Sequence, residues 1–444
     1  MALRLSVFLS IMFVLLSSSA QKQSSMALVG NGMTGAWLAR LLRDSGYAGA
    51  LTIYEKSTVY GGRCATKAFA SGARFDHGAQ YYALKNVMAP LHKYMTKSAL
   101  VNTWFTEKGV DRVKSPQGIS TLAKETTTNG DVDVKLQHQV AKLERIPATA
   151  TSVAAWRIHF TDGRAEAEVA VVVLTCPLPQ ALDILAASGI QYESSLGDIA
   201  YAKALVLLYS PKDDTQDAAF RMRLQQSTRL ANNNGFYTVT DQQNDATASA
   251  RDGEAGDAHS TAAAAGVYAI ADQRAKGVST VPAYTIIMNP AFSEAHYNDA
   301  EDADVVARIR AEMDTLFEDG GSGSKSKNAA AAAERFSFAA DGAGDLLFLK
   351  RWKYSHPLTT HSEPFVEVEV DDDDAEPSAR ALKAGRSTDD KEDKKEKKDK
   401  KTSKTAGFAS GLFLAGDAFG GASVPGAIAS ATALAAHIVE AQQL

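Results

Sequence analysis

Three glycines near the start of the chain are spaced as a turn that binds a dinucleotide. Gly30, Gly32 and Gly35 lie in GNGMTG, between the apolar run MALV and a segment with helical spacing. The first glycine of this pattern permits a tight turn, the second lets the backbone approach a pyrophosphate, and the third lets the helix pack closely on the strand. Unpaired N–H groups at the helix N-terminus then favour the phosphates. The spacing therefore predicts a bound dinucleotide.

An acid and a cationic turn follow the glycines. Glu55 closes a second apolar run, LTIYE, at the distance where a carboxylate can accept hydrogen bonds from the adenosine ribose. Gly61, Gly62 and Arg63 extend the glycine-rich surface, and Arg63 can reach a phosphate or the ring beyond it. The ligand predicted here is longer than one nucleotide.

A second candidate site lies near the end of the chain, in GLFLAGDAF. Gly416 and Asp417 follow an apolar strand and precede a turn and a helix that begins near Pro425. A carboxylate at this position can bind a sugar-alcohol chain. The positive end of the helix can face a ring that becomes an anion on reduction.

The substrate candidates lie in RWKYSHP. Alternation along a strand places Trp352 and Tyr354 on one face, and His356 with them if the strand continues, so that this face could stack on a planar ring. The alternative is that Trp352 is a core residue and His356 a turn residue before Pro357.

Composition and missing motifs exclude other classes. With 47 Lys and Arg against 52 Asp and Glu, the net charge of −5 provides no general attraction for nucleic acid. HExxH and GxSxG are absent from the sequence, and no metal site is predicted. Cys64 and Cys176 are too few for a disulfide framework; two free thiols are expected, with one bridge as the alternative.

The elements that must position these residues are those of an α/β protein. Strands are expected at MALV and LTIYE, with a helix over AWLARLLRD that ends at Gly46. Further strands are expected at HQVAKLERI, WRIHF, VVVLT, YAKALVLLY, AYTIIM and LFLKRWKY, and a helix over DADVVARIRAEMDTLF.

At the level of short motifs the chain resembles the renalase-like members of the flavin amine oxidase and renalase group of FAD proteins. The motifs are GMTG, GGR, GAQY, PQGIS, TCPLPQ, the W-[RK]-[YH] strand and the C-terminal GD, in the order found in that family. The resemblance covers residues 26 to about 440, except for insertions longer than the usual loops of the family and a poorly matched stretch at 211–265.

The resemblance implies non-covalent FAD and a set of contacts to it. The contacting residues would be Thr34, Glu55, Arg63, Gln80, Tyr81, Asp417 and Ile428, with the backbone of Val140 at the adenine. Taken singly, Tyr81 and Ile428 are equally compatible with a place in the core.

The resemblance also implies a two-lobed, Rossmann-like fold of the p-hydroxybenzoate hydroxylase type. Its discontinuous FAD domain would comprise 26–85, 131–200 and 405–444. The inserted substrate domain, with a mixed or antiparallel sheet, would comprise 86–130 and 201–365, followed by a charged, disordered insertion at 366–404. A basic docking segment is the alternative for that insertion.

The implied activity is that of an oxidase with a small-molecule substrate. It would take a hydride from dihydropyridine isomers of NAD(P)H and return the electrons to O2 as hydrogen peroxide. Two alternatives stay open, an amine oxidase acting on a primary or secondary amine and a secreted binding or signalling protein that keeps FAD as a structural element. The sequence indicates no oligomeric state.

The first 20 residues follow the pattern of a signal peptide. Arg4 precedes an apolar run that is too short to cross a bilayer, and small residues end at Ala20. The pattern predicts entry into the secretory pathway, with organelle targeting or a leader anchor as alternatives. No other stretch is expected to span a membrane.

Overall fold

The computed structural model describes residues 25–128, 130–149, 152–240, 266–317, 345–370 and 410–442. The predicted signal peptide and residues 371–404 of the predicted charged insertion lie outside these ranges.

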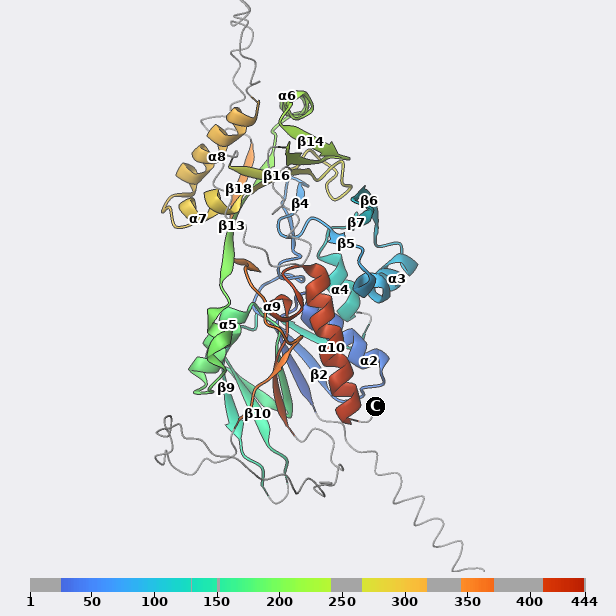
Figure 1. The fold of residues 1–444 in the computed structure, drawn as a ribbon, viewed down its shortest axis with the longest axis vertical. Coiled ribbons are helices and arrows are strands. Elements are labelled where there is room, and N and C mark those ends of the chain that lie inside the picture. Colours follow the sequence, from blue (N-terminus) through green and yellow to red (C-terminus); the bar gives the residue numbers. More distant parts are fainter. Residues whose placement is uncertain are drawn as a thin grey trace, which may run out of the picture.

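A six-stranded sheet, here called the Rossmann sheet, carries the glycine turn (Figure 1). In spatial order the strands are β19 (Val366–Glu367), β20 (Gly411–Leu414), β12 (Val171–Leu174), β1 (Met26–Val29), β2 (Leu51–Glu55) and β8 (Asp133–Leu136). Neighbouring strands are parallel except for β19 and β20. The strand order reverses beside β1, and ligands of such sheets bind at this point, at the carboxyl ends of the strands.

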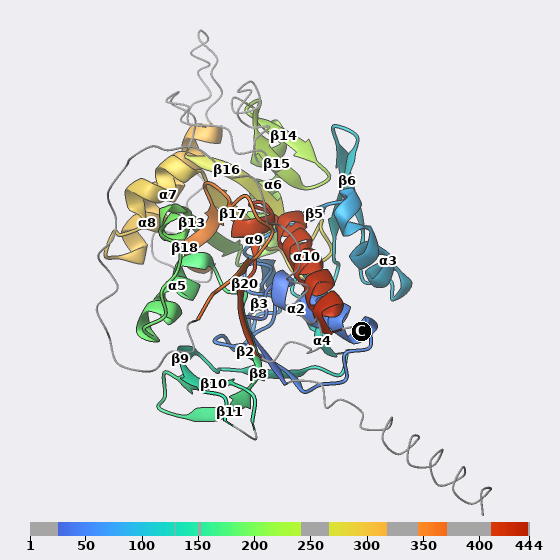
Figure 2. The same cartoon turned by 60° about the horizontal axis from the view of Figure 1, so that its bottom comes forward.

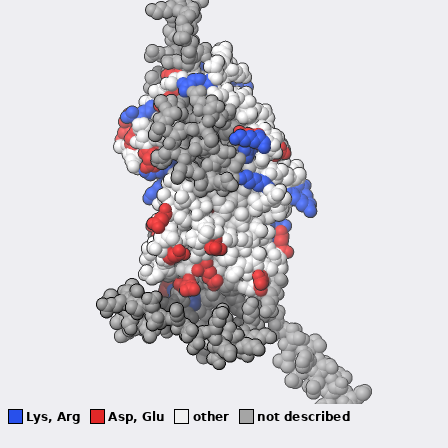
Figure 3. All heavy atoms as spheres, viewed as in Figure 1, with Lys and Arg blue, Asp and Glu red and all other residues white. Residues whose placement is uncertain are grey.

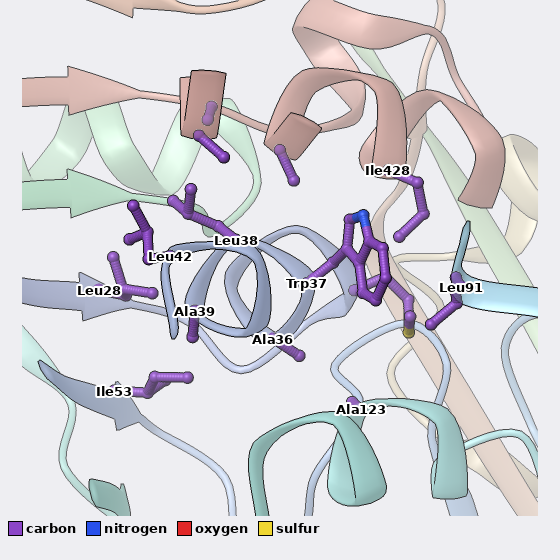
Figure 4. Close-up of a cluster of buried hydrophobic side chains, with 14 of the residues drawn as sticks. Leu28, Ala36, Trp37, Leu38, Ala39, Leu42, Ile53, Leu91, Ala123 and Ile428 are labelled. Carbon is purple, nitrogen blue, oxygen red and sulfur yellow. The ribbon is translucent and has the colours of Figure 1, made fainter. Parts of the chain in front are cut away.

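Helices cover one face of the Rossmann sheet. They are α2 (Met33–Asp44), α3 (Ala89–Lys97), α4 (Thr121–Thr128) and α10 (Val424–Gln442). Figure 4 shows α2 between Leu28 and Ile53 of the sheet, Ala123 of α4 and Ile428 of α10. Helix α2 ends as predicted, because Gly46 adopts φ 90° and its N–H donates to the carbonyl of Arg43.

A second layer covers the opposite face of the Rossmann sheet. It consists of a three-stranded sheet in the order β11 (Ala165–Val169), β10 (Ala155–Phe160), β9 (Val140–Ile146), together with α5 (Leu178–Ala187). Because β1, β12 and β20 are covered on both faces, every residue in them is buried, which explains their uninterrupted apolar sequences.

The second six-stranded sheet is antiparallel and lies at the other end of the molecule from β9–β11 (Figures 1 and 2). Along β13 (Tyr201–Ser210), Leu205 and Leu207 face a helical layer, whereas Val206 and Leu208 face a hairpin of β3 (Thr66–Ala68) and β4 (Arg74–Asp76). The sheet order is β14 (Leu230–Asn233), β15 (Phe236–Val239), β16 (Val267–Asp272), β17 (Tyr284–Met288), β13 (Tyr201–Ser210) and β18 (Leu346–Pro357). Its helices are α6 (Asp214–Gln226), α7 (Pro290–His296) and α8 (Asp302–Phe317).

The segment 86–130 differs from its predicted place in the substrate domain. Met88, Leu91 and Leu122 pack with α2 in the core under the Rossmann sheet, whereas Trp104 and Phe105 pack against the antiparallel sheet, beside Phe236. The segment contains η1 (Asn86–Met88), α3, β6 (Asn102–Glu107), β7 (Val110–Lys114) and α4. Strand β7 pairs with β6 on one side and with β5 (Tyr82–Ala83) on the other. A further short helix, η2 (Ser194–Asp198), follows α5.

Two other expectations need correction. Residues 366–370 were expected within the charged insertion, but Val366 and Glu367 pair with β20 and the N–H of Val368 donates to Leu412. No membrane-spanning stretch was expected beyond the leader, yet Val424–Ala441 of α10 is long and apolar enough by length and composition. Because this helix packs on α2 through Ile428 and other apolar residues, its composition has an explanation in the protein core.

The face shown in Figure 3 carries charges of both signs. Lys and Arg side chains lie mainly in the upper half, together with Asp and Glu, whereas Asp and Glu side chains predominate in the lower half. The described part of this face therefore forms no broad basic field of the kind that a nucleic-acid backbone attracts.

Candidate functional site

The predicted glycine turn joins β1 to α2 with very little space around it. Gly30 adopts φ 112°, and a Cβ on Gly35 would come within 2.2 Å of the carbonyl oxygen of Gly30 and 2.8 Å of the Thr175 hydroxyl. The Thr175 hydroxyl donates to the carbonyl of Gly30 at 2.9 Å and thus braces the turn from the end of β12. Gly32 is different, because a Cβ there would meet nothing within 4 Å.

Gly32 opens onto a cavity of about 280 Å³ between the glycine turn and the antiparallel sheet. Two helices begin at this cavity. Gly32, Met33 and Thr34 come from the start of α2, and Ser423 and Val424 from the start of α10. Neither helix carries an acidic residue in its first turn, and α2 has no side-chain cap, so their N–H groups and positive dipole ends favour an anionic or electron-rich ligand.

Arg63 and Asp417, from opposite ends of the sequence, meet at the same cavity. Their side chains form a bidentate ion pair with N–O distances of 2.6 and 2.7 Å. Burial alone would lower the pKa of Arg63, but the paired Asp417 carboxylate outweighs it and the pKa is raised. The Tyr201 hydroxyl donates to Asp417 at 3.4 Å, so the carboxylate is held between two elements. The sequence predicted both residues but not their pairing.

Glu55 lies at the end of β2, where it was predicted, and braces the glycine turn. Its Oε2 accepts the N–H of Asn31 at 2.8 Å, and its Oε1 accepts the N–H and the hydroxyl of Ser57 at 2.8 and 2.7 Å. A carboxylate oxygen has more than one acceptor site, so Glu55 can also accept a bond from a ribose hydroxyl.

The opposite wall of the cavity is apolar and aromatic. Trp352 is stacked on His77 with ring centroids 5.4 Å apart and an interplanar angle of 17°, and the indole N–H donates to the carbonyl of His77 at 2.8 Å. Ala204, Val206 and Ile287 of the antiparallel sheet complete what is called here the sheet wall. The facing residues Gly32, Met33, Thr34, Arg63, Asp417, Ser423 and Val424 are called the turn wall.

His77 is neutral in this environment. Burial and, to a smaller extent, the nearby Lys350 ammonium together lower the pKa of His77 to about 4. Its Nδ1 is buried and has no hydrogen-bond partner among the described residues. The sequence analysis did not select His77, although it directly precedes GAQY, a motif that was selected.

Tyr354 does not share the cavity face of Trp352 and His356. Ala202 of β13 pairs with His356 of β18, and Ala204 pairs with Trp352. A step of two residues along β13 therefore matches a step of four along β18, and this irregularity breaks the alternation of side chains between the two faces. Trp352 and His356 line the cavity, whereas Tyr354 packs against Tyr201 with ring centroids 5.8 Å apart. The prediction of one continuous face was therefore wrong for Tyr354.

Four of the other predicted contacts lie away from the cavity. Tyr81 packs in an aromatic cluster with Trp104, Phe105 and Phe236. Val140 and Ile428 are core residues in the two layers that cover the Rossmann sheet. The Gln80 amide is hydrogen-bonded within a buried network. Of the predicted residues, Gly32, Thr34, Arg63, Asp417, Trp352 and His356 line the cavity, and Gly30, Gly35, Glu55, Gly62 and Gly416 shape the turns beside it.

The network that holds Gln80 contains a fully buried ion pair. The Lys276 ammonium lies 2.6 Å from Asp76, with both side chains at 0% exposure. Burial lowers the pKa of Lys276, and the Asp76 carboxylate opposes that effect. Since Asp76 ends β4 and Lys276 follows β16, the pair joins the segment after the glycine turn to the antiparallel sheet.

The two cysteines are free, as expected. Burial raises the pKa of both thiols, Cys64 and Cys176, to about 12. Cys64 lines the cavity as a protonated, weakly nucleophilic group at neutral pH. Within the described ranges, no group of three or more His, Cys, Asp or Glu side chains is placed to hold a metal ion.

Comparisons with known proteins agree with the fold of the Rossmann sheet and its helices. Residues 28–95 match the family model described as an NAD(P)-binding Rossmann-like domain. No curated protein matches the sequence. A provisionally assigned protoporphyrinogen oxidase from Exiguobacterium sp. 255-15 has a similar structure, with a TM-score of 0.55 and 10% identity over 94% of this chain and 99% of its own.

A second structure, a CLA-producing fatty acid isomerase from P. acnes, gives a TM-score of 0.44 and 11% identity over 76% of this chain and 88% of its own. Residues 28–95 thus form an NAD(P)-binding Rossmann-like domain, and the α/β fold of the described residues is similar to that of the Exiguobacterium protein.

Proposed function

We propose that this protein is an FAD-dependent oxidoreductase whose flavin lies in the cavity between the turn wall and the sheet wall. The observation that carries the proposal is the meeting of two helix N-termini, Arg63 and Asp417 on one side of a cavity with an apolar, aromatic opposite side. Such an arrangement suits a long dinucleotide on the turn wall and a reduced substrate on the sheet wall.

The residues present fit this cofactor. The space around Gly32 lets a pyrophosphate approach the start of α2, and the space beside Gly416 is equally open, since a Cβ there would meet nothing within 4 Å. Glu55 would bind the ribose, Asp417 the ribityl chain, and the start of α10 would face the flavin ring. When bound, FAD supplies a two-electron acceptor.

FAD is favoured over NAD(P) by the extent of the site. The NAD(P)-binding model covers only residues 28–95, whereas the turn wall continues through Asp417 to Val424. A single glycine turn with its acid serves the adenosine and phosphates of either cofactor. A second helix start and a second carboxylate suit a longer cofactor. The name of the Exiguobacterium protein, that of an oxidase, is in keeping with this choice.

For the reaction, we propose the renalase type. A dihydropyridine isomer of NAD(P)H would lose a hydride and become an aromatic pyridinium, and O2 would take both electrons with two protons to give hydrogen peroxide. Aromatisation drives the hydride loss, so no strong base is needed, in keeping with a neutral His77 and a protonated Cys64 at the cavity. The sheet wall would shield the reacting carbon from water.

An amine oxidase is the second candidate, but its aromatic cage would need two tyrosines or equivalents beside the flavin. Tyr81 and Tyr354 both lie away from the cavity, while Trp352 and His77 stack on each other. The described residues thus favour the dihydropyridine substrate. A protein that keeps FAD only as a structural element would show no turnover with either class.

The visible absorbance of the purified protein, followed by anaerobic mixing, tests these alternatives. The proposal expects a flavin spectrum that bleaches with dihydropyridine isomers of NAD(P)H and returns with peroxide when air is admitted. Bleaching by amines alone would replace the proposed substrate, and a flavin that neither class reduces would support the non-enzymatic alternative. N-terminal sequencing of protein secreted by the expressing cells tests the proposed signal peptide.

A further inference from the structure

Two lysines stand beside the sheet wall with their ammonium groups against aromatic rings. Lys350 precedes Trp352 by two residues on β18, and its Nζ lies 4.5 Å from the centre of the indole. Lys67 on β3 lies 4.5 Å from the ring centre of Phe348 and 5.3 Å from that of Phe69. Both lysines are half-buried, so they occupy an apolar, partly desolvated setting.

Neither lysine has an anionic partner in the described part of the chain. Other lysines of the protein are neutralised by carboxylates, as Lys276 is by Asp76 and Lys203 is by Glu294 at 2.7 Å. No carboxylate forms an ion pair with Lys67 or Lys350 among the residues that the structure describes.

The two charges are close enough to act on each other and on the cavity. Burial lowers the pKa of Lys350, and the Lys67 ammonium lowers it further. Both lysines also lower the pKa of His77. Burial has the largest effect on this pKa and Lys350 the next largest, whereas the effect of Lys67 is smaller than the opposing effect of Asp76. Like charges held together in a half-buried setting are unfavourable, and a bound anion would relieve the repulsion.

The position of the pair indicates what the anion belongs to. Lys350 touches Trp352 and pairs across the sheet with Val206, and both of these residues line the cavity, so the ammonium groups lie next to the sheet wall although neither lysine lines the cavity itself. We propose that Lys350 and Lys67 bind a carboxylate or phosphate group of the substrate while its flat, apolar part lies on the sheet wall. The proposal rests on the proposed function, because it takes this cavity to be the substrate site.

The experiment measures binding to the FAD-loaded protein by isothermal titration calorimetry. The ligands are 2-naphthoate, 2-naphthyl phosphate and the neutral 2-naphthamide, which share one planar ring. At least one anion is expected to bind about tenfold more tightly than the amide, since a charge-assisted hydrogen bond contributes about that factor. The tighter of the two anions identifies carboxylate or phosphate as the group recognised.

Lys350→Gln and Lys67→Gln are each expected to remove most of this preference while leaving naphthamide affinity unchanged. Lys353→Gln is the matched control, because Lys353 lies on the same strand and is exposed. Equal binding of the anions and the amide, or a preference that survives both substitutions, would overturn the anion site. If one variant fails to fold, the other variant still tests the anion site. The salt dependence of naphthoate binding to the wild-type protein tests it as well, because added salt should weaken binding of the anion to the lysines.

Bound flavin, measured by absorbance in each preparation, separates the two proposals. A flavin-loaded protein without the anion preference overturns only the lysine site. Protein that takes up no FAD overturns the proposed function.

Discussion

The two walls of the cavity are built by different means. The turn wall comes from short motifs with local partners, as in the contact of Gly35 with the carbonyl of Gly30, and the Arg63–Asp417 ion pair joins two of these motifs from opposite ends of the chain. The sheet wall combines Trp352, Val206 and Ile287 from three strands with His77 from a loop. Local sequence therefore specifies the motifs of the first wall but not their ion pair, whereas strand register and an irregularity specify the second wall.

This difference has a functional reading. A wall defined by backbone N–H groups and helix dipoles suits a cofactor that many proteins share, because it recognises phosphate and ring charge. A wall defined by side chains on a sheet can change its specificity through single substitutions, since backbone geometry is not involved. The lysines at 67 and 350 belong to this second kind of surface.

The largest expected effect comes from the buried ion pair between Asp76 and Lys276, which joins the segment after the glycine turn to the antiparallel sheet. Asp76→Asn should lower the free energy of unfolding by about 3–5 kcal/mol, because it leaves the buried Lys276 ammonium without its counter-ion. Glu294→Gln, at the exposed pair with Lys203, should cost less than about 1 kcal/mol. Urea denaturation of both variants measures the difference.

The double variant Asp76→Leu/Lys276→Met sharpens the result. It should be less destabilised than the sum of its single variants, because it leaves neither charge unpaired. An Asp76→Asn variant as stable as Glu294→Gln would show that the pair does not hold the segment after the glycine turn to the antiparallel sheet.

The next effect concerns the sheet wall and depends on pH. Burial keeps the pKa of His77 near 4 in the folded protein against an ordinary value of 6.5, so the unfolded chain takes up the proton first as pH falls. His77 should therefore remove stability on the order of 3 kcal/mol between pH 7 and pH 4.

His77→Phe keeps an aromatic ring against Trp352 and should lack this contribution. Its free energy of unfolding should fall less steeply than that of wild type over the same pH range, as measured by urea titrations at several pH values. Parallel profiles would mean that His77 is solvated and does not belong to a closed sheet wall.

A pair of glycine substitutions tests the turn wall. Gly35→Ala should lower the free energy of unfolding by about 2 kcal/mol, because its Cβ would overlap the carbonyl oxygen of Gly30. Gly32→Ala should change it by less than about 0.5 kcal/mol, since the site is open and Gly32 already has φ −79°. Thermal or urea denaturation of the two variants, compared at equal concentration, provides the check.

Much of the Rossmann-like domain could be predicted from the sequence, because its elements have strong local signals. β2 covers LTIYE and α8 covers DADVVARIRAEMDTLF as predicted, and α2 ends at the expected glycine. α6 was missed, although Asp213 caps it by accepting the N–H of Gln216. Its apolar residues are few, so helical periodicity is weak there.

The site was predictable to the extent that it is local. Gly32, Arg63 and Asp417 lie on the cavity because each ends or follows a strand of the Rossmann sheet. Tyr81 was expected at the cofactor and lies in an aromatic cluster instead, and Tyr354 was displaced by the irregularity opposite Ala202 and Ala204. Such outcomes depend on contacts between distant segments, which neither spacing nor alternation encodes.

The central claim is that a flavin dinucleotide lies on the turn wall, and FAD binding by wild type and Gly32→Ala tests it most directly. Titration of FAD into each cofactor-free protein should give one tight site in wild type and a binding constant weakened by about tenfold or more in Gly32→Ala, because the added methyl group stands where the pyrophosphate approaches. Wild-type protein that takes up no FAD, or a Gly32→Ala variant that binds it equally well, would contradict the account.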